Sequence, residues 1–309
     1  MPSPRPELPP LFTVTADVRD ALASGRPIVA LETSVLSQGL PPPHNLESAY
    51  AMDRAVRSEG AVPAWTAVDQ GRVRVGLGEG DLERFCDRTL PIAKVARRDY
   101  PAALASGGMG ATTVSAALWA AAQLRIDIMA TGGIGGVHPR SGDVSADLLE
   151  MARLPGMVVC AGPKSIVDPV ATMERLEELG VLVVGYGTDR LPFFIVHDVD
   201  LALEHRVDTP RAAAALARVR RGLGTSSAVL LCQPVARDRA LQRRSVDEAV
   251  KECEARAAAH GVTGKAVTPF LLSTLALVTG GASLAANLAL LHANATLAAR
   301  IAVEASETA

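Results

Sequence analysis

A stretch from Ile126 to Lys164 constrains the possible folds of this chain more than any other. It opens with an apolar run, Ile126–Ala130, and passes into a glycine-rich segment, Thr131–His138. It closes with a second apolar run, Met157–Ala161, shortly before the lysine. Two short β-branched runs on either side of a helical segment at Asp147–Met151 predict a β-loop-α-β unit. Ligands of open α/β sheets bind at the carboxyl ends of the strands, which is where these glycines lie.

The glycine pattern of this loop, Gly132-Gly133-Ile134-Gly135-Gly136, differs from the common nucleotide-binding patterns. Its spacing is not that of the dinucleotide fingerprint, and no Gly-Lys-Ser/Thr follows, as a Walker loop would require. Glycine can take a positive φ and let backbone amides approach an anion. The loop therefore predicts a site for a phosphate or another anion without a nucleotide cofactor. The alternative is a tight turn before a helix.

A second glycine-rich loop, Ser106–Val114, leads into an Ala-rich helix. The N-terminus of a helix attracts anions, because its N–H groups are free and its dipole is positive there. Lys94 is the only charged residue of a short strand that precedes this loop. Lysine and loop together predict a phosphate site. The alternative for Lys94, and for Arg97 and Arg98 after it, is a solvated basic edge.

Composition narrows the class of protein. Hydrophobic residues make up 49% of the 309 residues and aromatic residues only 3%. The core must therefore be built from Ala, Val, Leu and Ile, as is usual for helices packed on a largely parallel sheet. The formal net charge of -2 argues against a nucleic-acid-binding surface, which needs clustered Lys and Arg.

The cysteines and the lengths of the apolar runs indicate in which cellular compartment the protein is expected. Cys86, Cys160, Cys232 and Cys253 are far apart and form no CxxC or Cys-His cluster, so we expect structural thiols in a reduced, cytoplasmic protein. Residues 1–10 lack the apolar core of a signal peptide, and we find no apolar run long enough to span a bilayer. No membrane association is expected.

Hydrophobic periodicity and turn residues predict strands alternating with helices. The expected strands are Pro27–Leu31, a hairpin of Ala64–Val68 and Arg72–Val75, then Ile92–Val95, Ile126–Ala130, Met157–Ala161, Val181–Gly185, Leu191–Val196 and Ala228–Cys232. The expected helices are Thr15–Leu22, Asn45–Ser58, Glu79–Asp87, Val114–Leu124, Asp147–Met151, Val170–Gly180, Pro210–Leu223, Ser245–His260, Thr268–Thr279 and Ser283–Val303. We expect a single three-layer α/β/α domain over residues 1–309, with a mixed, largely parallel sheet and a flexible tail at residues 1–12.

Polar residues near the strand ends supply the candidate catalytic groups. The carboxyl ends of parallel strands meet at one edge of a sheet, so these groups are expected to share one cleft: Glu32, Lys94, His138, Asp143, Asp147 and Lys164. A carboxylate that closes an apolar strand, as Glu32 does, is either a capped structural group or a catalytic acid. A lysine in apolar surroundings is a nucleophile once it is uncharged, or else it caps a loop carbonyl; both remain open for Lys164. In the last helix, Asn287 and Asn294 must each bond to backbone or to a ligand if buried.

A series of motifs resembles that of the pseudouridine-5'-phosphate glycosidase family, which includes proteins like indigoidine synthase A and C-glycosynthases. They come in the family's order and span about Pro27 to Val303. The motifs are Leu31-Glu32-Thr33-Ser34, Gly39-Leu40-Pro41, Gly110–Val114, Thr131–His138, Asp143–Leu148, Cys160–Asp168, Gly264-Lys265, Thr268–Leu272 and Asn287.

The resemblance implies an enzyme that reversibly breaks the carbon-carbon glycosidic bond of pseudouridine 5'-phosphate, giving uracil and ribose 5-phosphate with the help of a divalent metal, usually Mn²⁺. By this resemblance Glu32 is the acid that protonates the ring oxygen, and Lys164 bonds to C1' of the opened sugar. The base leaves as its carbon is protonated, and water releases the sugar. Covalent catalysis of this kind divides one difficult cleavage into several easier steps.

The resemblance also implies a set of binding residues. It places Lys94, Thr112, Thr113 and Val114 on the substrate at its phosphate, and Ser145, Ala146 and Asp147 at the sugar phosphate and the metal-bound water. It places Asp143 on the metal, Thr131 on the substrate, Asn287 at the nucleobase, and His138 at the phosphate or in support of it. A hard carboxylate ligand with several waters suits Mn²⁺ or Mg²⁺. No nucleic-acid or membrane partner is implied, and a homotrimer is expected, with the apolar C-terminal helices as a possible contact.

Some positions depart from the family pattern. Only four residues separate His138 from Asp143, Gln38 stands where a His is common, and Met109 stands where a bulkier side chain is common. These departures affect the specificity for the base more than they affect the chemistry at the sugar. The alternative function is therefore a C-glycosynthase, which attaches ribose 5-phosphate to an aromatic acceptor with the same sugar-side residues. A non-catalytic phosphosugar-binding protein is a third reading, but Glu32 and Lys164, which it would have lost, are both present.

Overall fold

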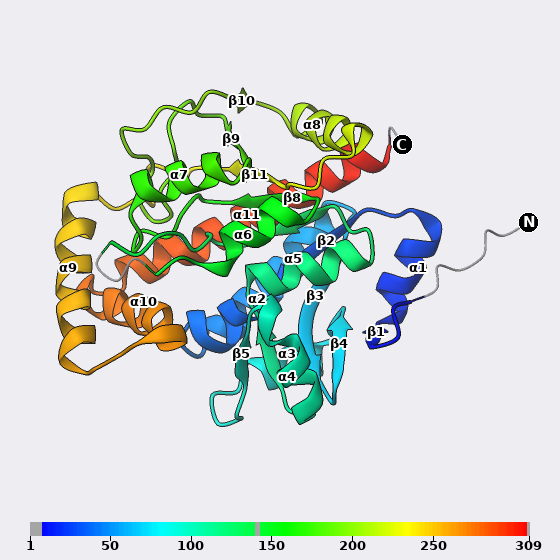
Figure 1. Ribbon diagram of the computed structural model, residues 1–309, viewed down its shortest axis with the longest axis horizontal. Coiled ribbons are helices and arrows are strands. Elements are labelled where there is room, and N and C mark those ends of the chain that lie inside the picture. Colours follow the sequence, from blue (N-terminus) through cyan, green and yellow to red (C-terminus); the bar gives the residue numbers. More distant parts are fainter. Residues whose placement is uncertain (1–7, 140–142, 308–309) are drawn as a thin grey trace, which may run out of the picture.

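The computed structural model describes residues 8–139 and 143–307, and these form one mixed sheet with helices on both faces (Figure 1). The strands are β1 (Phe12–Val14), β2 (Ile28–Glu32), β3 (Val62–Asp69), β4 (Arg72–Val75), β5 (Ala93–Val95), β6 (Gly110–Thr112), β7 (Ile128–Ala130), β8 (Met157–Cys160), β9 (Leu182–Tyr186), β10 (Arg206–Val207) and β11 (Val229–Cys232). Their order is β1-β4-β3-β2-β7-β8-β11-β9-β10, and β6 joins β5 to β3. The predicted α/β fold with a mixed, largely parallel sheet is confirmed.

The central strands of the sheet are parallel and buried. Strands β2, β7, β8 and β11 pair with one another in parallel, whereas β3 pairs antiparallel with β4 and β6. Every residue of β2, β3, β7, β8 and β11 is buried. Strands covered on both faces read as continuous apolar runs, which explains why these strands are visible in the sequence. All four central parallel strands end at the same edge of the sheet.

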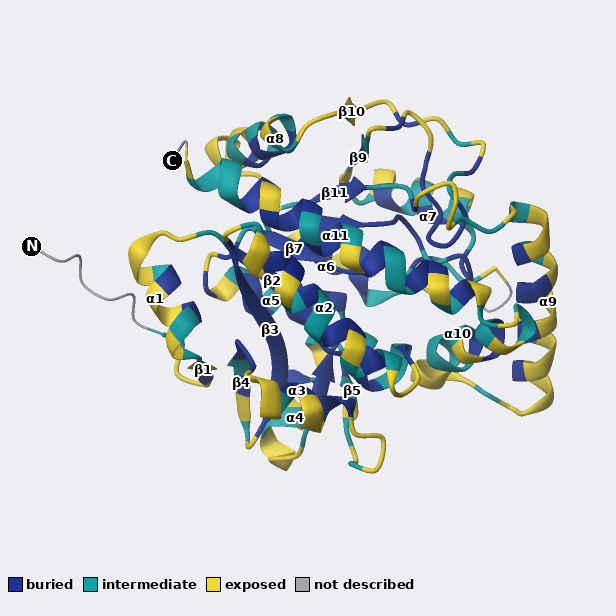
Figure 2. Cartoon of the chain, turned by 180° about the vertical axis from the view of Figure 1, so that it is seen from behind, coloured by how far each residue is buried: buried dark blue, intermediate teal, exposed yellow. Residues whose placement is uncertain are grey.

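Helices cover both faces. They are α1 (Ala16–Ser24), α2 (His44–Ser58), α3 (Glu79–Cys86), α4 (Tyr100–Ser106), α5 (Val114–Gln123), α6 (Ala146–Arg153), α7 (Pro169–Glu178), α8 (Pro210–Leu223), α9 (Arg243–Ala259), α10 (Val267–Val278) and α11 (Ala282–Ser306), with short turns η1 (Val35–Gly39), η2 (Arg97–Asp99) and η3 (Gly264–Ala266). Helices α5 and α6 pack together on one face, and α11 packs between α2 and α8 on the other (Figures 1 and 2). Helix α10 packs on α9 and on η1, beside the edge where the strands end.

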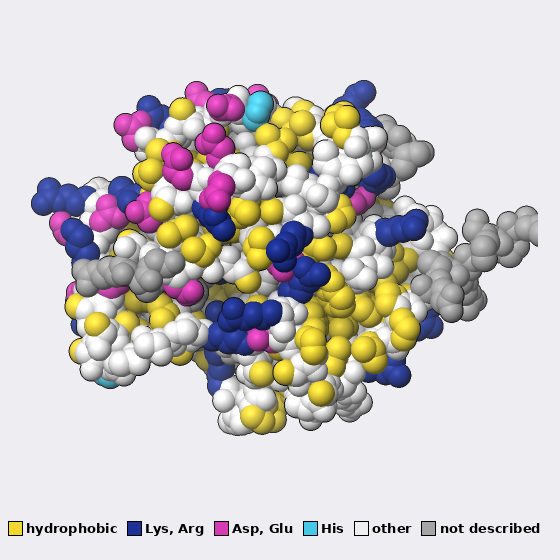
Figure 3. Space-filling view, in the orientation of Figure 1, with side chains coloured by type: hydrophobic (Ala, Val, Ile, Leu, Met, Phe, Trp, Pro, Cys, Tyr) yellow, Lys and Arg dark blue, Asp and Glu magenta, His cyan; other side chains and the backbone are white. Residues whose placement is uncertain are grey.

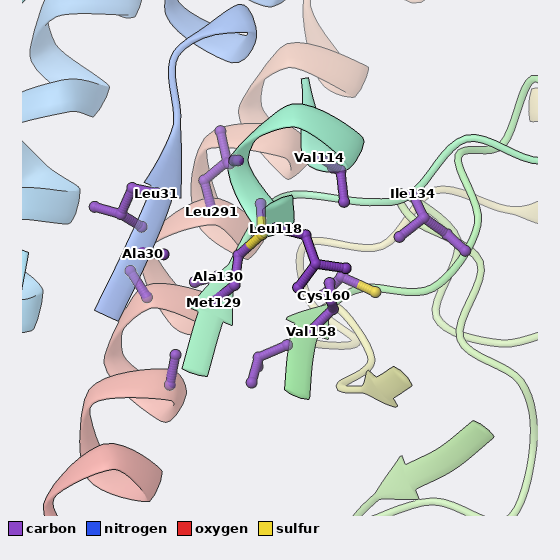
Figure 4. Close-up of a cluster of buried hydrophobic side chains, with 14 of the residues drawn as sticks. Ala30, Leu31, Val114, Leu118, Met129, Ala130, Ile134, Val158, Cys160 and Leu291 are labelled. Atoms are coloured by element: carbon purple, nitrogen blue, oxygen red, sulfur yellow. The ribbon is translucent and has the colours of Figure 1, made fainter. Parts of the chain in front are cut away.

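The core joins the two helical layers through the sheet. Figure 4 shows Leu118 of α5 and Leu291 of α11 on the strands β2, β7 and β8, with Met129 and Val158 between them. All four side chains are at most 1% exposed. Small and branched apolar residues thus fill the space between layers, as the low aromatic content predicts.

Helix α11 corrects one expectation. Its 25 residues include a window with a mean hydropathy of 1.2, so by length and composition it passes the test for a membrane span that we expected no part of the chain to pass. In the structure 56% of that window is buried, against α2, α8 and the central strands (Figure 2). A helix that is apolar on most sides is also what the core of a large domain requires.

Four local expectations are also settled. The hairpin is confirmed: Gln70 and Gly71 both have positive φ, as the two central residues of a type I' turn require. Leu191–Val196 is wrong as a strand, because it forms only isolated bridges. The loop Ser106–Val114 contains β6, which pairs with β3 and β5. The tail expected at residues 1–12 ends earlier, since Phe12 begins β1 and is 7% exposed; residues 1–7 lie outside the described part.

Candidate active site

A cleft opens where β2, β7 and β8 end. With one exception, every residue predicted for the site lines this cleft: Glu32, Lys94, Thr113, Val114, Thr131, His138, Asp143, Ser145, Ala146, Asp147, Lys164 and Asn287. The exception is Thr112. Basic side chains gather on this side of the molecule above β5, between α10 and α5 (Figure 3). Residues from nearly the whole length of the chain therefore meet in one place, as the convergence of parallel strands predicts.

Glu32 is the last residue of β2 and is 4% exposed. Its Oε1 accepts a hydrogen bond of 3.2 Å from the Thr131 hydroxyl, and its Oε2 accepts one of 3.2 Å from the Val35 N–H and one from the Ser34 hydroxyl. These three donors fix the carboxyl group at the wall of the cleft. The Val35 N–H comes from η1, a π-helical turn that the sequence analysis missed; such turns occur often at functional sites.

Lys164 reaches the same cleft from the end of β8. The chain turns between them at Gly162, whose φ is +81° and where a Cβ would lie 2.0 Å from the carbonyl oxygen of Pro192. No side chain fits there, so glycine is required. The Lys164 N–H donates to the Ile134 carbonyl over 2.9 Å, which ties the lysine to the glycine-rich loop. Lys164 is half-buried, and so less enclosed than an apolar strand end suggested.

Lys94 is the second lysine of the cleft, and it is not part of a solvated basic edge. Burial lowers its pKa, and the charge of Lys164 lowers it further, while Asp147 and Glu32 act in the opposite direction. Arg97, by contrast, pairs with Glu150 at 2.7 Å, away from the cleft. Of the three basic residues that the sequence grouped together, Lys94 and Arg98 therefore line the cleft and Arg97 does not.

Lys265 adds a further positive charge to the cleft. In the sequence it was noted only as part of the motif Gly264-Lys265. It lines the cleft, and its Nζ lies 2.6 Å from Asp99 and donates to the Lys94 carbonyl over 3.3 Å. Through these contacts η3, which leads into α10, is attached to β5.

The glycine loop is built differently from the expectation. None of Gly132, Gly133, Gly135 and Gly136 has a positive φ. Instead, a Cβ at Gly135 would lie 2.3 Å from the Ser145 hydroxyl, and one at Gly133 would lie 2.8 Å from the Phe194 ring. Close packing, rather than a left-handed backbone that cradles an anion, therefore requires these glycines.

Asp147 joins the glycine-rich loop Thr131–His138 to the start of α5, directly after the second glycine-rich loop. Its Oδ1 accepts a hydrogen bond from the Ser115 N–H and its Oδ2 accepts one from the Gly135 N–H, both at 3.0 Å. The side chain is buried, and its position in the first turn of α6 is fixed by the Ser145 N-cap. The N–H of Ser115, in the first turn of α5, is thus paired within the protein. Asp147 lines the cleft, but each of its oxygens already holds a backbone amide.

Thr112 lies beneath the cleft rather than in it. It is fully buried, and its hydroxyl bonds to the Thr66 carbonyl at 2.7 Å and to the Thr66 hydroxyl at 2.8 Å. Its N–H donates to the Thr33 hydroxyl over 3.0 Å. Three buried threonines therefore link β2, β3 and β6, and the prediction of Thr112 as a binding residue is wrong for its side chain. The signal that was missed is that Thr112 belongs to a short strand whose neighbouring residues are also buried.

His138 and Asp143 lie at the mouth of the cleft. The His138 N–H donates to the Asp143 carbonyl over 2.8 Å. Burial lowers the pKa of the His138 imidazole, Asp143 opposes this, and the charges of Lys164 and Lys94 add to the lowering. The short loop between the two residues includes 140–142, which lie outside the described residues.

The two asparagines of α11 differ. Asn294 donates from Nδ2 to the Thr131 carbonyl over 2.9 Å and does not line the cleft, although its Oδ1 is also buried without a partner within the described chain. Asn287 is 7% exposed and lines the cleft, and its Oδ1 has no hydrogen-bond partner within the described chain. A buried polar atom without a partner is costly, which favours a ligand as the missing partner.

The donor set for a metal ion is sparse. Within residues 8–139 and 143–307, no three His, Cys, Asp or Glu side chains come together as a metal cluster. Asp143 is exposed at the cleft mouth, and Asp147 is already bonded to two amides. One carboxylate completed by water and a substrate phosphate is a usual arrangement for Mg²⁺ or Mn²⁺, so these residues fit a weakly held cation and not a closed cage.

Comparison with known proteins decides the family. Residues 17–304 match the family model of indigoidine synthase A like proteins. The chain belongs to this family. Among members of the indigoidine synthase A-like family, a pseudouridine-5'-phosphate glycosidase of Gemmatimonas aurantiaca is 49% identical over 290 residues, which cover 94% of each chain. A second, from Methylobacterium nodulans, is 46% identical and covers 91% of this chain and 84% of its own.

Solved structures of the family share the fold. The prealnumycin C-glycosynthase AlnA in complex with ribulose 5-phosphate has a TM-score of 0.88 at 37% identity, covering 97% of this chain and 98% of that one. An indigoidine synthase A-like protein from Thermotoga maritima has a TM-score of 0.88 at 31% identity, covering 96% and 97%. The resemblance read from the motifs is thereby confirmed at the level of family and fold.

Proposed function

We propose that this protein is a pseudouridine-5'-phosphate glycosidase, which reversibly converts pseudouridine 5'-phosphate and water to uracil and ribose 5-phosphate. The meeting of Glu32 and Lys164 in one cleft carries the proposal. Curated relatives that are 46% and 49% identical over most of the chain bear this name. A carbon-linked base has no glycosidic oxygen or nitrogen to protonate, so an acid and an amine suit this substrate better than the two carboxylates of ordinary glycosidases.

In the proposed reaction Glu32 gives a proton to the ring oxygen, and the sugar ring opens. The Lys164 amine then bonds to C1', the base carbon takes up a proton, and the C1'–carbon bond breaks as its electron pair goes to the base. The lysine nitrogen shares its lone pair with C1', which gives an iminium between Lys164 and the sugar. Water then hydrolyses this iminium to ribose 5-phosphate and the free amine. Each step passes through groups within reach of one cleft, which is the advantage of covalent catalysis.

The phosphate is proposed to bind among the cationic groups of the cleft, near Lys94, Thr113 and Val114. The charge of a phosphate dianion compensates the burial of Lys94. Lys265 and Arg98 line the same region. Thr131 would contact the sugar, Ser145 and Ala146 the sugar phosphate, His138 the phosphate or its surroundings, and Asn287 the base.

A divalent cation, Mn²⁺ or Mg²⁺, is proposed at Asp143. Such an ion supplies positive charge that orients a phosphorylated substrate. Asp147 would support this site through ordered water, because its own oxygens hold the glycine-rich loop Thr131–His138 and the start of α5. Removal of divalent ions with a chelator, and their return, tests the requirement.

A C-glycosynthase is the second candidate. The structural match to AlnA at 37% identity favours it, and the sugar-side chemistry is the same. Incubation with pseudouridine 5'-phosphate and Mn²⁺ separates the two, since we expect free uracil, and none from the Lys164→Ala variant. No uracil at high enzyme concentration would reject the glycosidase in favour of the synthetic reaction.

A cytoplasmic homotrimer is proposed for the assembly. All four cysteines are buried and free, in keeping with a reducing compartment. Helix α11 is an unfavourable contact between subunits because it packs inside its own chain. Sedimentation of the purified protein tests the trimer, and a monomer would contradict it.

A further inference from the structure

The cleft continues past Asn287 into a second, larger chamber. The two spaces share Gln38, Gly39, Phe194, Pro269, Leu272 and Asn287 as lining residues. The chamber has a volume of about 740 Å³, against about 210 Å³ for the catalytic cleft. Its lining comes mainly from η1, α10 and the first turns of α11, and the described lining residues include no lysine. A ligand bound at Lys164 therefore has open space beyond its base.

The walls of this chamber are apolar. Ile195, Leu275, Ala276 and Leu284 line it, and none of them lines the catalytic cleft. Among the described residues that line it, Arg88 alone is charged, and its guanidinium donates to the Ser37 and Leu40 carbonyls. A charged ligand would find no free counter-charge here. The chamber fits an uncharged, apolar group.

Two unpaired oxygen atoms stand at the junction of the two spaces. Asn287 Oδ1 and Gln38 Oε1 are both buried and have no partner in the described ranges, while Gln38 Nε2 donates to the Ile92 carbonyl over 3.3 Å. Both residues line both spaces. Each oxygen needs an N–H or O–H donor, so the junction is complementary to a planar ring that carries two donors.

We propose that the chamber is an aglycone subsite that holds the second ring of an uncharged, fused-ring aglycone larger than uracil. This inference rests on the proposed function, because it takes the sugar to be held at Lys164. The first ring donates to Asn287 and Gln38, and the second ring is buried among Ile195, Leu275 and Leu284. Uracil has the two donors but leaves the chamber empty.

Resorcinol and 1,3-dihydroxynaphthalene test this subsite, because they carry the same two hydroxyl donors and differ by one fused ring. Their binding is measured by calorimetry in the presence of inorganic phosphate, which cannot bond to Lys164, so that the readout does not depend on turnover. We expect the naphthalene to bind at least about tenfold more tightly, from burial of the added apolar ring. Equal affinities would overturn the proposal.

Two variants locate the effect. Ala276→Phe fills the chamber and is expected to reduce the tenfold preference to near one. Ala285→Phe makes the same change at an exposed position of α11 that lines neither space, and is expected to keep the preference. Gln38→Met removes a shared acceptor and should weaken both ligands alike. A preference that survives in a folded Ala276→Phe protein overturns the proposal.

Failure of this inference and failure of the proposed function give different results. If the wild type releases uracil but binds both ring systems equally, only the subsite is rejected. If it releases no uracil, the glycosidase is rejected whatever the calorimetry shows. Equal binding together with dissociation of an oligomer by Ala276→Phe would assign the chamber to a second copy of the chain, which also overturns the subsite.

Discussion

The Thr131 hydroxyl donates a hydrogen bond of 3.2 Å to the carboxyl group of Glu32, across the boundary between β2 and β7. The two residues are 99 positions apart in sequence and meet because their strands are parallel neighbours. Both side chains are buried, so the contact is protected from water. The proposed acid is therefore held by the sheet itself.

This contact predicts a graded loss of activity. Glu32→Gln keeps the shape but removes the proton donor, and we expect turnover to fall at least about 100-fold. Thr131→Val leaves the acid in place with one donor fewer, and should lower turnover by about tenfold, the equivalent of one net hydrogen bond. Rates of uracil release measure both. Thr296→Val, at a half-buried position of α11 that does not line the cleft, is the control, and an unchanged rate in Glu32→Gln would reject the acid.

Asp147 is predicted to matter for stability as well as for activity. Asp147→Asn replaces one acceptor oxygen by an NH₂ group that faces a backbone N–H, so one buried amide loses its partner. We expect a loss of about 3 kcal/mol in the free energy of unfolding. Denaturant titration measures it. Asp200→Asn is the control, since that side chain is 94% exposed; equal stability of the two variants would contradict the role of Asp147 in joining the loop to α5.

The glycines of the two loops should differ in their tolerance of a methyl group. Gly135→Ala places a Cβ 2.3 Å from the Ser145 hydroxyl, so the backbone must move, at a cost of about 1–3 kcal/mol. Gly108→Ala meets only the Ser106 hydroxyl, at 3.6 Å, and should stay within about 0.5 kcal/mol of wild type. Thermal unfolding compares them. A destabilised Gly108→Ala beside an unaffected Gly135→Ala would contradict the packing argument.

Phosphate binding should take up a proton at alkaline pH. In the free protein the pKa of Lys94 is lowered, chiefly by burial, so part of the Lys94 population is uncharged above neutrality. A phosphate dianion nearby favours the charged form and raises that pKa, so the complex binds more protons than the free protein. At about pH 9 the phosphate is fully ionised and contributes no proton of its own.

Calorimetry of ribose 5-phosphate binding in buffers of different ionisation enthalpy measures this uptake. It should disappear in Lys94→Met and persist in Lys251→Met, an exposed residue of α9. Proton release, or uptake that persists without Lys94, would place the phosphate elsewhere.

The sequence was most informative in the central strands of the sheet, where apolar runs are followed by single charged residues. The central strands are continuous apolar runs, and Glu32 and Lys164 stand out as the charges at their ends, so both fold and cleft follow from the convergence of parallel strands. The role of the glycines did not follow, because a sequence does not distinguish a positive φ from a close approach of Ser145 or Phe194. That difference is a property of tertiary packing.

Other features were not predicted from the sequence, for related reasons. The family resemblance assigned Thr112 to the ligand together with Thr113 and Val114, but Thr112 ends β6 and its side chain is buried against Thr66. The π-helical turn η1 has no sequence signal of its own, since the same Val35–Gly39 residues are compatible with a loop. The chamber beyond Asn287 is formed by α10, α11 and η1 together, and no one segment contains it.

The identity of the nucleophile is the central claim, and three of the described lysines line the cleft and compete for this role: Lys94, Lys164 and Lys265. Borohydride reduction of the protein with ribose 5-phosphate, followed by peptide mass spectrometry, tests the claim most directly. We predict that the mass of the reduced sugar appears on the peptide that contains Lys164, and that the folded Lys164→Ala variant remains unlabelled. Label on Lys94 instead, or release of uracil by Lys164→Ala, would contradict the account.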